Sequence, residues 1–89
     1  MEIEKKINDI LREFSLDNKL QAYKKLKKIF SNYQTNNKIR YNIAVMEKEL
    51  GFKNQARINF RFLIEKIDHL KSMLNLYLIE LEDGEYLSA

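Results

Sequence analysis

The residues of this 89-residue chain that could do acid–base or metal chemistry are few and scattered. Its only histidine, His69, follows Asp68 at the expected start of a helix, where a capping or surface role explains it better than a catalytic base. The sequence has no cysteine and no glycine-rich phosphate loop or nucleophile elbow. A carboxylate cluster near the C-terminus lacks supporting metal ligands and consists of Glu80, Glu82, Asp83 and Glu85. We therefore expect no enzyme, no metal and no cofactor.

Phosphate binding is the second chemistry to consider, because lysines crowd one stretch of the chain. This basic run contains Lys19, Lys24, Lys25, Lys27 and Lys28. Tyr23 and Phe30 belong to the apolar stripe of the same segment, so they are poorly placed to stack on bases. The net charge is only +3, and a hydrated lysine face keeps a helix soluble. We favour a solvated face and keep a small nucleic-acid-associated regulator as the alternative.

Composition limits the class of protein. A chain of 89 residues forms a single domain, residues 1–89, with a modest core. The N-terminus is charged and carries no signal-peptide pattern, and no apolar run reaches the length of a membrane span. Together with the lack of cysteine, this predicts a cytoplasmic protein without a membrane partner.

Apolar spacing predicts five helices and the start of a sixth. Their expected ranges are 3–14, 18–33, 38–50, 53–67, 69–82 and 85–89. Asp17 and Asp68 are expected to cap the helices that follow them, and Gly51 to end the third helix in a left-handed conformation. The second helix is expected to turn Leu20 and Tyr33 inward with the rest of its apolar residues.

The apolar pattern recurs after 34 positions. Ala22 is followed by Ala56, and Leu26 by Phe60, at this offset. The same offset joins Ile29 to Leu63, Phe30 to Ile64, Leu16 to Leu50, Leu11 to Val45 and Ile10 to Ala44. A repeat of this length cannot bury its own apolar face, so it must stack on a neighbour. The period predicts an array of antiparallel helix–turn–helix units.

One segment carries a family resemblance: Ile43-Ala44, Gly51, Ala56-x-x-x-Phe60 and Leu63. It resembles the tetratricopeptide repeat (TPR), a helix–turn–helix unit of 34 residues. The resemblance implies an all-α fold, a TPR-like α-solenoid of about two and a half repeats, at residues 3–36, 37–70 and, in part, 71–89. The sequence departs from the family at its usual tryptophan, where Arg40 and Lys6 stand, and at the aromatic that follows it in the same helix, where Glu47 and Glu13 stand.

The resemblance also implies a binding groove along the first helix of each repeat. Carried over by position, the groove residues are Ile7, Leu11, Phe14, Tyr41, Val45, Asn75 and Ile79. Because most of them are apolar, we expect a protein or peptide partner docked by area and shape. The alternative is that these side chains pack inside a small bundle.

The fifth expected helix is apolar around most of its circumference. A helix of this kind needs cover on several sides, and its neighbours in the array can cover only one. The predicted self-association residues are Leu70, Leu74, Leu78 and Leu81. They fit a homo-oligomer, a docked partner, or further repeats in a longer protein. The last case includes the non-catalytic N-terminal array of a larger enzyme such as a bacterial transferase.

Overall fold

The computed structural model describes residues 2–82, and all of its regular structure is helical. The five helices are α1 (Glu2–Ser15), α2 (Lys19–Phe30), α3 (Asn37–Leu50), α4 (Lys53–Ile67) and α5 (Leu70–Glu82). The prediction of an all-α fold is confirmed for these residues, and the predicted range of α4 agrees with the structure at both ends. The predicted start of a sixth helix at 85–89 lies outside the described residues.

Helix α2 ends at Phe30, three residues before the predicted end. The backbone N–H of Asn32 donates to the carbonyl of Ile29, and that of Tyr33 to Phe30, so the chain tightens into turns with a spacing of three. The Ser31 hydroxyl donates to the Lys28 carbonyl at 2.6 Å and competes with helix continuation. Tyr33 is consequently 45% exposed, which contradicts the predicted inward orientation.

The predicted caps at Asp17 and Asp68 are wrong. Both residues adopt left-handed backbone, with φ of 84° and 53°, so each ends the preceding helix rather than beginning the next. His69 takes the place expected of Asp68, since its Nδ1 accepts from the backbone N–H of Ser72 at 3.2 Å. Gly51 has the predicted left-handed conformation, with φ of 85°.

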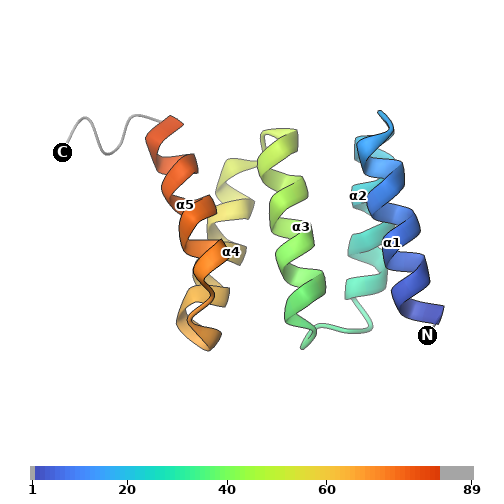
Figure 1. Cartoon of the computed structure of the whole chain (residues 1–89), viewed down its shortest axis with the longest axis horizontal. Helices are drawn as coiled ribbons and strands as arrows, with labels where there is room; N and C mark the ends of the chain where they lie inside the picture. Colours follow the sequence, from blue (N-terminus) through green and yellow to red (C-terminus); the bar gives the residue numbers. More distant parts are fainter. Residues whose placement is uncertain (1, 83–89) are drawn as a thin grey trace.

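The helices form two layers (Figure 1). Helices α1, α3 and α5 run alongside one another in the near layer, and α2 and α4 lie behind them. The closest packing joins helices that follow one another in the chain, and α3 also touches α5. The resulting slab measures 45 × 30 × 17 Å. This arrangement leaves α5 at one end of the molecule and the α1–α2 pair at the other (Figure 1).

The core consists of two apolar clusters. The first lies among α1, α2 and α3 and contains Ile7, Ile10, Ala22, Tyr23, Leu26, Ile39, Ile43 and Met46. The second joins α3, α4 and α5 through Ala44, Ala56, Phe60 and Ile79. Alanine at 44 and 56 lets α3 and α4 approach closely, and the Phe60 ring fills the space beside them. Leu20 was expected inside but is 45% exposed.

Local geometry recurs at the offset of the sequence repeat. Asp17 and Gly51 share nearly the same φ, and they occupy the same place between the two helices of a pair. The backbone N–H of Ala22 donates to Asn18 at 3.1 Å, and that of Ala56 donates to Phe52 at 3.0 Å. The two helix pairs, α1–α2 and α3–α4, therefore begin their second helices with the same backbone hydrogen bond.

Candidate functional site

The outward face of α5 is an apolar row. Its large side chains are between 38% and 68% exposed, although each of them is a leucine or a tyrosine. The row, called here the α5 row, comprises Leu70, Leu74, Tyr77, Leu78 and Leu81. It includes all four residues that the sequence predicts for self-association. These side chains lie together on one side of the helix because residues three and four apart are neighbours on a helix surface.

The opposite side of α5 is the side that packs on the array. Ser72 and Ile79 are fully buried, and Leu76 is partly buried against the α3–α4–α5 cluster. At 3.6 residues per turn, Ile79 points away from Leu70, Leu74 and Leu81 on the helix circumference. Helix α5 thus has two apolar sides, of which one is covered by α3 and α4 and the other faces solvent.

Three of the four predicted groove residues on α3 and α5 are partly buried, and two of these, Asn75 and Tyr41, are hydrogen-bonded to each other. The Asn75 amide donates to the Tyr41 hydroxyl at 3.1 Å and accepts from Lys48 Nζ at 2.6 Å. The Tyr41 ring packs on Phe60, and its centroid lies 4.9 Å from that of the His69 ring. Val45 packs beside them against the second core cluster. Ile79 lies in the core and offers no surface to a partner.

The predicted groove residues on α1 belong to the other core cluster. Ile7 is 6% exposed and is a core residue, whereas Leu11 and Phe14 pack partly buried against it. The structure therefore brings the predicted set together as two groups, one on α1 and one on α3 and α5. Each group continues a different core cluster to the surface.

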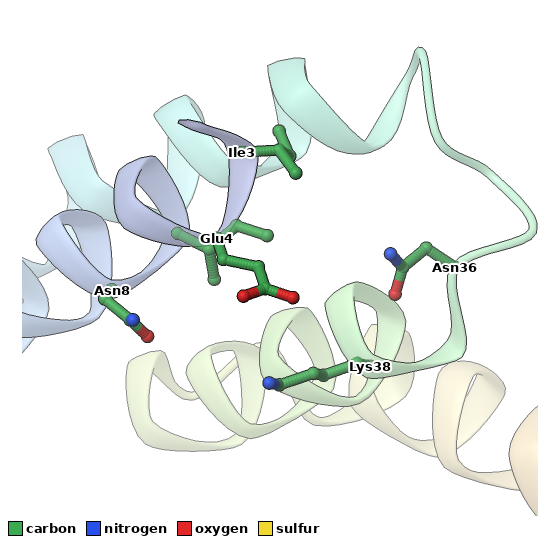
Figure 2. A pocket seen from close by; sticks show the side chains of 6 residues that line it. Ile3, Glu4, Asn8, Asn36 and Lys38 are labelled. Atoms are coloured by element: carbon green, nitrogen blue, oxygen red, sulfur yellow. The ribbon is translucent and has the colours of Figure 1, made fainter. Parts of the chain in front are cut away.

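Two hollows open on the layer formed by α1, α3 and α5. The first, of about 200 Å³, lies between α1 and α3, and Figure 2 shows the Glu4 carboxylate directed into it near Asn36 and Lys38. The second, of about 390 Å³, lies between α3 and the start of α5, where Tyr41 and Lys71 are among its lining residues. Lys38 borders both hollows. Each hollow includes one predicted groove residue, Ile7 in the first and Tyr41 in the second, beside asparagines and lysines that were not assigned to the groove from the sequence.

Comparison with protein-family models, curated protein sequences and solved structures finds no significant match. The site must therefore be interpreted from its own residues.

A buried polar network links the two helix pairs. Glu47 is 1% exposed, and its carboxylate accepts from the Tyr23 hydroxyl and from the Asn59 amide, both at 2.7 Å. Burial and the neighbouring Glu47 raise the pKa of Tyr23 well above its ordinary value. Asn59 Oδ1 in turn accepts from Arg40 Nη1 at 2.9 Å. Apart from Arg40 Nε, which is buried without a hydrogen-bond partner, these groups satisfy one another, which indicates a structural role rather than a reactive one.

Arg40 occupies the position at which the TPR pattern usually has tryptophan. Its guanidinium lies 3.8 Å from the centre of the Phe62 ring and 4.9 Å from that of Phe30. Desolvation by burial lowers its pKa from the ordinary value. The planar, weakly hydrated guanidinium thus packs against both aromatic rings. Neither the burial of Glu47 nor the half-buried position of Arg40 was predicted from the sequence, since charged residues on a helix usually face solvent.

The lysines of α2 make local contacts on an exposed face. Lys25 Nζ lies 3.0 Å from Glu13 of α1, and Lys27 Nζ lies 5.5 Å from the centre of the Tyr23 ring. These contacts engage part of the basic charge within the fold. Among residues 2–82, no three metal-ligating side chains gather at one point, and no helix has the length and apolarity needed to cross a bilayer.

Proposed function

We propose that this chain is a TPR-like array of helix pairs that works as a non-catalytic protein–protein interaction module. The recurrence of backbone geometry at Asp17 and Gly51, and of the first hydrogen bond of α2 and α4, supports equivalent units at the period of the TPR. Packing mainly between successive helices also fits a solenoid, in which each unit contacts its neighbours.

The observation that carries the function is the exposure of the α5 row. A row of five large apolar side chains on one helix is costly to leave in water, and such patches mark surfaces that bind other proteins. Leucine and tyrosine supply contact area with few polar groups to desolvate. The α5 row is therefore the primary docking surface in this proposal.

The layer of α1, α3 and α5 is the second candidate surface. Tyr41 and Val45 are partly exposed at its centre, and a hollow opens on each side of α3. A bound peptide there would meet apolar side chains at Tyr41 and Val45 and polar groups in the hollows. The two surfaces share no residue, but Tyr41 and Val45 also hold α5 against α3. The fold of a variant at these positions is therefore compared with that of the native protein by circular dichroism before binding is measured.

Selection of displayed random peptides against the immobilised protein tests the proposal. We expect apolar peptides whose binding is lost when Leu74 and Leu78 are both changed to glutamate. Ile58→Glu is the matched control, since Ile58 is a comparably exposed apolar residue on α4. Peptides that tolerate the double change but lose binding to a Tyr41→Glu, Val45→Glu variant would assign the function to the second surface. Failure to select any binder dependent on either surface would contradict the proposal.

A further inference from the structure

The α5 row corresponds to the side of α3 that covers the next helices of the array. Helix α3 begins at Asn37 and α5 at Leu70. Each residue of α5 therefore corresponds to the α3 residue that lies 33 positions earlier in the sequence. At this offset Ser72, Leu76 and Ile79, which pack on the array, match the α3 residues Ile39, Ile43 and Met46 of the first core cluster. The two helices therefore present equivalent positions to the helix before them.

The exposed residues of α5 follow the same correspondence. Leu74 matches Tyr41, and Leu78 matches Val45. Tyr41 and Val45 are the residues through which α3 meets α5, by the hydrogen bond to Asn75 and by packing against the second cluster. The α5 row is thus shaped as a surface for stacking further helices, with leucines in place of the α3 residues.

The opposite end of the array does not complement this surface. Helix α1 has charged residues at the positions that lie one repeat, or 34 residues, before Ile39, Ile43 and Met46. These residues are Lys5, Asp9 and Arg12, and all three are exposed. This end carries charge where α3 and α5 carry mostly apolar residues. Head-to-tail stacking of copies would bury those charges against leucines at a considerable desolvation cost. Leu16 and Leu20 are also exposed near the α1–α2 end, but within the described array five large apolar side chains line one face of a single helix only on α5.

We infer that the occupant of the α5 row is a second copy of this chain, joined tail to tail across a two-fold axis with the two α5 helices antiparallel. This inference rests on the proposed function and names its partner. A two-fold contact is self-complementary, so the same row serves on both copies. Leucines of one row then pack between those of the other, as knobs fill holes in helix pairs.

Charge at the ends of the row favours the antiparallel direction. Lys71 and Glu82 flank the row on the same side, one near each end of α5. In an antiparallel pair centred between residues 76 and 77, Lys71 of each copy faces Glu82 of the other. Glu82 makes an intramolecular contact with Lys53 at 3.7 Å, yet its side chain is 64% exposed and stays within reach. In a parallel two-fold pair, Lys71 and Glu82 of one copy would lie on the opposite edge of the interface from those of the other, so this charge pairing would not form.

Five half-exposed side chains make an interface at the small end of the range for specific complexes, so we expect weak association. The oligomeric state is therefore measured first, by light scattering or sedimentation across roughly 1 µM to 1 mM protein. We expect a monomer–dimer equilibrium that Leu74→Glu with Leu78→Glu abolishes and Ile58→Glu leaves unchanged. A monomer at every concentration overturns the second copy as occupant. The peptide selection described above would still decide whether the row binds protein at all.

Charge reversal tests the direction of pairing. Lys71→Glu alone and Glu82→Lys alone should each weaken the dimer by roughly threefold to tenfold, and the double reversal in one chain should restore it. The two residues lie 11 positions apart, about 16 Å along one helix, so restoration requires contact between copies. If the single reversals weaken the dimer and the double reversal does not restore it, the antiparallel arrangement is overturned. The proposed function is left intact by that result.

Cysteine cross-linking gives an independent readout, since the chain has no native cysteine. Tyr77→Cys lies next to the two-fold axis, so we expect a rapid disulfide between copies under mild oxidation. Leu70→Cys should not cross-link to itself, because the two sites would stand about 20 Å apart, far beyond disulfide reach. Faster cross-linking at Leu70→Cys than at Tyr77→Cys would establish a parallel pair and overturn the inference.

Discussion

Asp17 and Gly51 hold the same left-handed turn, with φ of 84° and 85°, although only one of them is glycine. An L-residue in this conformation is strained by its Cβ, whereas glycine is not. Asp17→Gly should therefore raise the free energy of unfolding by about 0.5 kcal/mol, the relief of strain being partly offset by the entropy of glycine in the unfolded chain. Urea denaturation of the two proteins measures the difference.

Gly51→Ala is the converse substitution at the equivalent site. A Cβ at Gly51 would meet no atom within 4 Å, so only the backbone conformation penalises the change. We expect a loss of about 1 kcal/mol in unfolding free energy and no change in oligomeric state. An unchanged stability would show that the left-handed turn is not maintained in solution.

The buried carboxylate of Glu47 and the partly exposed carboxylate of Glu13 provide a matched pair at equivalent positions of the two repeats. Glu47 accepts from Asn59, and Glu13 lies 3.0 Å from Lys25, which is the counterpart of Asn59 in the first repeat. Glu47→Ala should cost about 3 kcal/mol, because it leaves the Tyr23 hydroxyl and the Asn59 amide without their acceptor. Glu13→Ala should cost less than about 1 kcal/mol, since its ion pair is open to solvent.

Chemical denaturation of both variants decides this comparison. Equal losses at the two positions would contradict the burial of Glu47. The conservative variant Glu47→Gln should lose an amount of unfolding free energy between those of Glu47→Ala and Glu13→Ala, because the glutamine amide can accept from only one of the two donors.

The raised pKa of Tyr23 predicts instability in alkali. The fold favours the neutral phenol, so its contribution is fully present below the unfolded-state pKa of about 10 and is lost as the pH rises through the folded-state pKa. Unfolding free energy measured from neutral pH to above pH 10 should decline faster in the native protein than in Tyr23→Phe. The same variant should be less stable at neutral pH, since Glu47 loses a donor. Parallel curves for the two proteins would refute the assignment.

Sequence reasoning succeeded where local chemistry decides the structure. The turn at Gly51, the range of α4 and the apolar character of the α5 row follow from residue type and spacing. It failed for Glu47, because the burial of that carboxylate depends on Tyr23, which is distant in the sequence and lies on another helix. It failed for the cap of α5 as well, since aspartate is a commoner N-cap residue than histidine. Asp68 cannot take that role because its backbone is left-handed, as the C-cap of α4.

The cap of α5 gives a final prediction. Because His69 Nδ1 accepts from the Ser72 backbone and lies 2.8 Å from the Ser72 hydroxyl, the imidazole holds the first turn of the helix that carries the α5 row. His69→Ala should destabilise the protein by about 1 kcal/mol, and His69→Asn should retain much of the cap through its side-chain oxygen. Hydrogen exchange should be faster in the first turn of α5 in the alanine variant and unchanged in α1. Faster exchange throughout the molecule would instead indicate that the histidine supports the core through its contact with the Tyr41 ring.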